Sequence, residues 1–383
     1  MQLVDLALTP IDSARGLLEL SADRLAALLN GIEAEEDLGN KYMKLFVIFQ
    51  NFQMDDFALE MQAKALQYRN AFRFLAPTTP RLRLLAIVGP GNMTDNAPLD
   101  FVLFNQNVQL DYFYVVGPDP SWEQVPDHDV AILALGESSK NALIHQRIEA
   151  QRVNWPRPFL NHAEGVMRCA RDRLYALFKD DPDLCTPRTL RVERRDVGKQ
   201  RIPFLIRPID LHAGEGFEKI EDPQALESYL GKNGADCFYL SEYIDCSRAD
   251  GLFRKFRIAL IDKKPYVCHL AVSESWVVHY ISAHMELSLD KRQEEERFMN
   301  EFNTVFLRKH GQCLDRIADK IDLDYVVLDC AESVGGKLIL FEADNGGWIH
   351  DTDSPVVYPY KSYFMNLAFE AFTRMLESKL TSH

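Results

Sequence analysis

Three acidic residues stand at the ends of two short apolar runs in the stretch DYVVLDCAESVGGKLILFEADNGG (324–347). Glu342 and Asp344 lie two positions apart, so on a regular strand they share a face. A tight hairpin would return Glu342 beside Asp329, which lies 13 positions earlier. Like charges brought together need a compensating cation, and hard carboxylate oxygens suit Mg²⁺. The hairpin therefore predicts a magnesium site at Asp329, Glu342 and Asp344, with Asn345 as an extra ligand; for any single acid, a solvated turn is the alternative.

A second candidate site lies in the stretch FLIRPIDLHAGEGFEKI (204–220), where a strand is expected to end at Arg207. The loop that follows contains His212, Gly214 and Gly216. Small, flexible residues let backbone N–H groups approach phosphate oxygens, and a guanidinium group is a permanent cation that suits phosphate. An ordinary hairpin turn with a surface arginine is the alternative. Beside a carboxylate cluster, we favour phosphate binding.

Two further strands carry candidate contacts. In CFYLSEYIDCSRADG (237–251), Tyr243 and Ile244 follow a strand and are expected to pack on a planar base, although a plain strand end has the same composition. In RKFRIALIDKKPYVCH (254–269), Lys255 and Arg257 share one face of a strand. Such pairs are usually solvated, but near a phosphoryl group they would neutralise developing charge.

The elements that must position these residues are predicted as follows. Residues 1–78 read as a helical segment, in which Phe57, Met61, Tyr68 and Phe72 are expected to lie near one helical face. Residues 79–158 carry three apolar runs that each end in glycine, which predicts a small parallel α/β domain. The loop GPGNMTD after the first run is interpreted as a turn rather than a phosphate loop. From residue 202 the strands become antiparallel in character, and residues 159–383 are expected to form an α+β domain.

Composition limits the function. The 383 residues carry a formal net charge of −14, which argues against duplex nucleic acid or an anionic membrane as the main partner. No run of apolar residues is long enough to span a bilayer, and the first residues lack the features of a signal peptide. The seven cysteines form no C-x-x-C pair, so neither a disulfide framework nor a zinc site is expected. We expect a cytoplasmic protein.

The order of these parts resembles the ATP-grasp superfamily, which includes D-alanine–D-alanine ligase, glutathione synthetase and the RimK-like ligases. The resemblance covers roughly residues 82–375 and implies a small α/β domain before two α+β lobes that clamp ATP. The family signature, an acid at one strand end and E-x-N at the next, is matched here by Asp329 and by Glu342-Ala343-Asp344. Two positions depart from the pattern, since Arg207 stands where the family has lysine and Asp344 where it has asparagine.

The resemblance also implies roles for individual residues. The segment SEYID is similar to the family hinge, which makes Glu242, Tyr243 and Ile244 nucleotide contacts. Asp250 is a further nucleotide candidate. Arg207, His212, Gly214, Gly216 and Lys255 would bind phosphate, while Arg207, Lys255 and Arg257 would act in catalysis.

The implied reaction is an ATP-dependent ligation. A carboxylate would be activated as an acyl phosphate and then joined to an amine, with ATP and Mg²⁺, or Mn²⁺, as cofactors. The partners would be small-molecule or peptide substrates. A small-molecule kinase and a non-catalytic nucleotide-binding scaffold are the two alternatives. For the N-terminal helices we consider peptide capture and formation of a homodimer.

Overall fold

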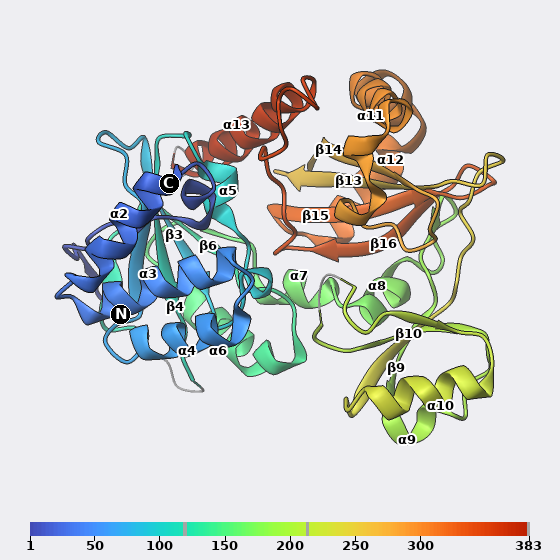
Figure 1. Cartoon of the computed structure of the whole chain (residues 1–383), viewed down its shortest axis with the longest axis horizontal. Coiled ribbons are helices and arrows are strands. Elements are labelled where there is room, and N and C mark those ends of the chain that lie inside the picture. The colour runs from blue at the N-terminus through green and yellow to red at the C-terminus, as the bar shows by residue number, and fades with distance from the viewer. Residues whose placement is uncertain (118–120, 212–213, 381–383) are drawn as a thin grey trace.

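The structure is a computed structural model that describes residues 1–117, 121–211 and 214–380. Figure 1 shows three bodies, each built on its own sheet. The first is mostly blue to teal, the second green to yellow, and the third mostly gold to red with green helices beside it. The fold is mixed α/β and α+β, as expected from the sequence. Within the described ranges, no helix is both long enough and apolar enough to cross a membrane.

The first body contains a sheet of strand order β2-β4-β3-β6-β7. Strands β3 (Leu82–Val88), β4 (Val108–Tyr114), β6 (Val130–Leu133) and β7 (Phe159–Leu160) pair in parallel. Their side chains are buried almost without interruption, as in parallel sheets covered on both faces. The predicted parallel α/β domain is therefore present. A small bridge of β1 (Leu3–Val4) and β5 (Val125–Pro126) lies beside it.

Helices cover both faces of this sheet. They are α1 (Ala14–Leu17), α2 (Ala22–Glu33), α3 (Leu38–Asn51), α4 (Asp55–Ala65), α5 (Leu99–Leu103) and α6 (Ala142–Arg152), with the short turns η1 (Met93–Asp95) and η2 (Ser139–Asn141). The first three begin at Ser13, Ser21 and Asp37, whose side chains accept hydrogen bonds from backbone N–H groups in the first turn.

The N-terminal segment is not helical throughout. Residues Ala71–Leu75 form strand β2, which pairs antiparallel with β4 and extends the sheet. The predicted helical face is therefore wrong beyond Ala65, because strand pairing overrides the local spacing of apolar residues. Phe72 is buried in β2, whereas Phe57 and Tyr68 are 54% and 55% exposed.

The second body is a four-stranded antiparallel sheet of order β11-β10-β12-β9. Its strands are β9 (Thr189–Glu193), β10 (Phe204–Pro208), β11 (Glu218–Ile220) and β12 (Cys237–Ser241). Helices α9 (Arg194–Val197) and α10 (Pro223–Lys232) accompany it, and α10 begins at the capping residue Asp222 with Pro223 in its first turn. Arg207 stands near the end of β10, as predicted.

The third body is a sheet of order β14-β13-β15-β16-β8. Its strands are β8 (Leu184–Cys185), β13 (Phe253–Ile261), β14 (Lys264–Ser273), β15 (Tyr325–Glu332) and β16 (Leu338–Asp344). The accompanying helices are α7 (Ala163–Arg168), α8 (Arg171–Phe178), α11 (Leu289–Glu301), α12 (Leu307–Ile321) and α13 (Lys361–Leu380), with the π-helical turn η5 (Phe302–Phe306) and the turns η3 (Ile281–Ala283) and η4 (Met285–Leu287). The predicted hairpin is present as β15 and β16.

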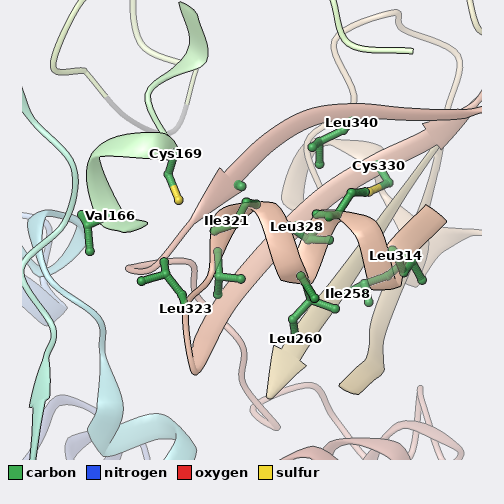
Figure 2. Packing of buried hydrophobic residues seen from close by; sticks show 14 of the residues in the cluster. Val166, Cys169, Ile258, Leu260, Leu314, Ile321, Leu323, Leu328, Cys330 and Leu340 are labelled. Carbon is green, nitrogen blue, oxygen red and sulfur yellow. The ribbon is translucent and has the colours of Figure 1, made fainter. Parts of the chain in front are cut away.

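One face of this third sheet is sealed by α12. Its buried residues recur every three or four positions, so they form one apolar stripe. Figure 2 shows Leu314 and Ile321 of α12 against Leu328 of β15 and Ile258 and Leu260 of β13. Every second residue of β15 faces this core, which leaves Asp329 on the opposite face. The other face of the hairpin is therefore available to line a site.

Candidate active site between the three sheets

A cavity of about 430 Å³ lies where the three bodies meet. That volume is within the range of pockets that bind small molecules. The first body, called the pre-domain below, contributes Met93, Thr94 and Pro98 to its lining. The middle sheet contributes residues of β9, β10 and β12, and the third sheet those of β13, β15 and β16. No single sheet could enclose it, so its shape depends on how the three are held together.

The three predicted acids all line one wall of this cavity. Asp329 on β15 is the register partner of Glu342 on β16, and Val327 is the partner of Asp344. Asp329 is only 5% exposed. The hairpin thus brings together the carboxylates that the sequence pattern suggested.

Two basic side chains of β13 hold the carboxylate of Asp329. Lys255 Nζ lies 3.0 Å from Oδ2, and Arg257 donates from Nε to Oδ1 at 2.8 Å and from Nη2 to Oδ2 at 3.0 Å. Burial works against ionisation, but the charges of Arg257 and Lys255 outweigh it and hold the pKa of Asp329 well below its usual value. Lys255 and Arg257 do share a strand face, as predicted.

A different cation pairs with Glu342. Arg171, at the start of α8, donates from Nη2 to Oε1 at 2.5 Å. Burial again opposes ionisation, yet the positive charge of Arg171, helped by Arg207 and Lys255, lowers the pKa of Glu342. Sequence reasoning missed Arg171, because its partner is 171 residues away and the helix carries no local signal for it.

Arg207 is the least compensated cation in the cavity wall. It is 8% exposed, its Nη2 donates to the backbone carbonyl of Leu211, and its Nε has no hydrogen-bond partner among the described residues. Burial and the nearby charge of Arg171 lower its pKa to about 10. A buried cation without a full set of acceptors favours an anion in the cavity, and phosphate oxygens match a guanidinium group.

These ion pairs already use carboxylate oxygens that the predicted metal site would need. Among the described residues, no three His, Cys, Asp or Glu side chains gather closely enough to hold a metal ion by themselves. Both oxygens of Asp329 already bond to Lys255 and Arg257, so its role as a ligand stays a prediction. Glu342 and Asp344, two positions apart on β16, do line the cavity and fit Mg²⁺, which commonly takes one or two carboxylates and completes its shell with phosphate oxygens and water.

Asn345 does not lie at this wall. Its side chain is fully buried and donates from Nδ2 to the backbone carbonyl of Leu135 at 3.0 Å. The predicted extra ligand is therefore wrong. The residue instead ties the end of β16 to the pre-domain, because strand alternation turns it away from the face that carries Asp344.

The other end of the cavity is apolar. Glu242, Tyr243 and Ile244, which were predicted as nucleotide contacts, follow β12 and line it together with Cys246, Phe253 and Phe341. Two aromatic residues that sequence reasoning missed extend this surface. Trp276 packs edge-on against Tyr243, with ring centroids 5.7 Å apart, and contacts Phe217 at 5.5 Å. This apolar and aromatic surface, called the slot below, suits a planar base.

Three predicted contacts remain to be placed. Gly214 lines the cavity, whereas a Cβ on Gly216 would lie 2.8 Å from the Pro208 ring, so that glycine serves the close approach of the turn. Asp250 is exposed and outside the lining, where it pairs with Arg254 at 2.7 Å and accepts from the Leu252 N–H. His212 falls outside the described residues.

Comparison with known proteins gives a likeness in structure alone. No protein-family model matches the chain, and no curated protein matches it. D-alanine–D-alanine ligase from Bacillus anthracis, solved with ATP, is similar over 79% of this chain and 99% of its own, with 11% identity and a TM-score of 0.49. VanG D-Ala:D-Ser ligase from Enterococcus faecalis is similar over 78% of this chain and 99% of its own, with 12% identity and a TM-score of 0.49. A RimK-domain ATP-grasp protein from Sphaerobacter thermophilus is similar over 76% of this chain and 99% of its own, with 11% identity and a TM-score of 0.46. Likeness at this level decides neither the family of the chain nor its activity.

Proposed function

We propose that this chain is an ATP-dependent ligase that activates a carboxylate as an acyl phosphate and joins it to an amine. The observation that carries the proposal is a cavity lined by an apolar slot, an acidic wall and an incompletely compensated cation, Arg207, whose Cζ lies 5.9 Å from the centroid of the Phe217 ring. A nucleoside triphosphate has the matching chemistry, with a planar base and a polyanionic chain.

In the proposed reaction the base occupies the slot formed by Glu242, Tyr243 and Ile244. Arg207 binds phosphate oxygens, and Lys255 and Arg257 lie close enough to add positive charge to the same end of the cavity. A substrate carboxylate oxygen attacks the γ-phosphorus, the bond to the bridging oxygen breaks, and ADP leaves. Two anions approach each other in this step, so the surrounding cations lower its barrier.

A divalent ion would be held by Glu342 and Asp344, and when bound it would neutralise phosphate charge. Mg²⁺ is the proposed ion, with Mn²⁺ as an alternative. The chain's own residues then contribute two things. Arg171 keeps Glu342 ionised and oriented, and the paired cations of β13 keep Asp329 ionised. In the second step, the amine attacks the acyl carbon and inorganic phosphate leaves.

Several parts of this proposal come from the sequence. The division into residues 1–78, 79–158 and 159–383 is the proposed domain organisation, except that β2 (Ala71–Leu75) and β7 (Phe159–Leu160) belong to the sheet of the second unit by their pairing. The proposed partners are small-molecule or peptide carboxylates and amines. A cytoplasmic location and a homodimer remain predictions.

A kinase built on the same cavity is the second candidate, because the cations would serve transfer to a hydroxyl equally well. Hydroxylamine separates the two reactions. An acyl phosphate is trapped as a hydroxamate, whereas a phosphorylated hydroxyl is not. A scaffold that binds ATP without turnover is the third candidate, and it predicts binding without release of ADP.

The test of the proposal is ADP release from MgATP over a panel of amino acids and short peptides, with mass detection of the product. The proposal predicts ADP release that requires both a carboxylate and an amine, and a product whose mass is the sum of the two minus water. A product that carries a phosphoryl group would overturn it in favour of the kinase.

A further inference from the structure

A short segment of the pre-domain, residues 135–139, is bonded to both of the other bodies. Its sequence is LGESS, and it follows strand β6. At its start, the carbonyl of Leu135 accepts the hydrogen bond from Asn345 Nδ2 that ties the end of β16 to the pre-domain. At its end, two serines bond to the turn after β10 of the middle sheet. This stretch, called the junction segment below, is therefore fixed to the ends of two strands that line the cavity.

The two serines hold a single carboxylate. Asp210 Oδ1 accepts from the hydroxyl of Ser138 at 3.0 Å and from the backbone N–H of Ser139 at 2.8 Å. Its Oδ2 accepts from the hydroxyl of Ser139 at 2.5 Å. Hydrogen bonds to an ionised acceptor are about twice as strong as those between neutral groups, so three donors on one carboxylate make a specific contact between the two bodies. We call this contact the clasp.

The junction segment is itself held in place within the pre-domain. The Gly136 N–H donates to the carbonyl of Asp95 at 2.9 Å, and the Gly136 carbonyl accepts from Nε2 of His145 on α6 at 3.0 Å. A Cβ on Gly136 would lie 2.9 Å from the Asp95 carbonyl oxygen, so only glycine allows this close approach. The His145 side chain is buried, which shields its bond from water. The clasp thus joins Asp210 to a firmly held part of the pre-domain.

The clasped turn also determines where Arg207 directs its guanidinium group. Asp210 has a φ of +62°, a left-handed conformation that a residue other than glycine keeps where surrounding contacts hold it. The next residue, Leu211, offers its backbone carbonyl to Arg207 Nη2. Arg207 Nε has no hydrogen-bond partner among the described residues, so it is available to an anion in the cavity. The carbonyl that orients this cation therefore lies one residue from the clasp.

We propose that the clasp formed by Ser138, Ser139 and Asp210 positions Arg207 for phosphate binding, so that the pre-domain sets the affinity for ATP through the middle sheet. The three are positioning residues, because they act on the guanidinium group through the Leu211 carbonyl. The junction segment is bonded to the end of β16 as well, so it also fixes the distance between Arg207 and the acidic wall. The inference rests on the proposed function for ATP as the ligand and not for the reaction that follows.

The test is calorimetric titration of the double variant Ser138→Ala, Ser139→Ala with MgATP and with adenosine. We expect Kd for MgATP to rise about tenfold and Kd for adenosine to stay within about twofold, because the clasp acts on the phosphate contact alone. Replacing both serines with threonine keeps the hydroxyl groups and should restore the wild-type affinity for ATP. If the alanine variant does not fold, Asp210→Gly takes its place, since glycine adopts the left-handed conformation without the clasp.

The matched control is Ser228→Ala. Ser228 is an exposed serine of α10, in the same body as Asp210, and its replacement should leave both dissociation constants unchanged.

A double-mutant cycle with Arg207 separates positioning from general damage to the fold. Arg207→Ala removes the group through which the clasp acts. Adding the two serine changes to it should therefore weaken MgATP binding by no more than about twofold further. Unchanged ATP affinity in the serine variant, equal weakening of ATP and adenosine, or the same loss with and without Arg207 would overturn the inference.

The outcomes also separate this inference from the proposed ligase. A protein that binds ATP and shows the coupling to Arg207, but releases no ADP with any carboxylate and amine, would overturn the ligase and support the clasp. A protein that releases ADP but shows no coupling would overturn the clasp alone. A wild-type protein that binds no ATP would overturn both.

Discussion

Asp329 and Glu342 are register partners on neighbouring strands, yet each carboxylate is neutralised by different cations. Asp329 bonds Lys255 and Arg257 of β13, whereas Glu342 bonds Arg171 of α8. Two acids can stand side by side in a cavity wall because each has its own counter-charge. The arrangement keeps both ionised before any ligand arrives.

Glu342→Gln tests the acidic wall. The change keeps the shape and an oxygen that can accept from Arg171, but it removes the negative charge that a divalent ion would need. We expect ADP release to fall by about a hundredfold or more, as for other groups that act on transition-state charge. The loss in Tm should be smaller than in Asp329→Asn, because the Glu342 side chain is 32% exposed and that of Asp329 only 6%. Turnover and thermal melting are the measurements.

The control for this prediction is Glu370→Gln on α13, which changes an exposed carboxylate far from the cavity. Its turnover and its Tm should both match the wild type. Wild-type turnover in the Glu342 variant would remove this residue from the proposed reaction.

Arg207→Ala tests the phosphate contact. Loss of a charged hydrogen-bonding group should weaken MgATP binding by about one to two powers of ten. Titration calorimetry measures the change in Kd. Arg195→Ala, which removes an exposed guanidinium group at the start of α9, is the control and should leave Kd unaltered. Equal affinities in the two variants would show that Arg207 does not bind the nucleotide.

Asp329→Asn should destabilise the protein even without ligand. It leaves Lys255 and Arg257 partly buried beside a neutral group, and removing one partner of a buried ion pair costs about 3–5 kcal/mol. Urea unfolding at pH 7 with a chelator present measures the loss. A free energy of unfolding equal to the wild type would contradict the ion-pair account.

The same variant has a pH signature. The pKa of Asp329 is lower in the folded protein than in the unfolded chain, so its contribution is fully present above about pH 4, the unfolded value. It is lost as the pH falls from there toward the folded pKa, because the folded state must then take up a proton. The difference in stability between wild type and Asp329→Asn should therefore shrink below about pH 4. If the free energies of unfolding of the two proteins changed in parallel from pH 7 down to pH 3, the ion-pair account would be contradicted.

Trp276 should report nucleotide binding. It contacts Tyr243 and Phe217 at the apolar end of the cavity, where a stacked base would alter its surroundings. We expect MgATP to change the intrinsic fluorescence of the protein and Trp276→Phe to remove most of that change. Trp122→Phe, in an aromatic cluster of the pre-domain, should retain it. If the signal survives in Trp276→Phe, the base binds elsewhere.

The acidic wall could be predicted from the sequence because the features that indicate it lie within one short segment of the chain. Apolar runs of strand length, a short turn and the even spacing of Glu342 and Asp344 determine both the hairpin and the shared face. The same regularity predicted that Lys255 and Arg257 point the same way on β13. Each of these depends only on the two-residue period of a strand.

What the sequence could not predict depends on contacts between distant segments. The pairing of Arg171 with Glu342 joins a helix to a strand 171 residues away. Asn345 looked like a ligand because it follows Asp344, but its bond to Leu135 comes from the way the bodies are packed together. Phe72 matched a helical spacing, and only its pairing with β4 decides that it lies in a strand.

The central claim is that the cations of this cavity, Arg207 foremost, bind the phosphates of ATP. The most direct measurement is calorimetric titration of the wild-type protein with ATP and, separately, with adenosine, both in Mg²⁺ buffer. The account predicts one ATP site per chain and adenosine binding at least about a hundredfold weaker, since adenosine lacks the charge that the cavity matches. Absence of ATP binding, or equal affinity for the two ligands, would contradict it.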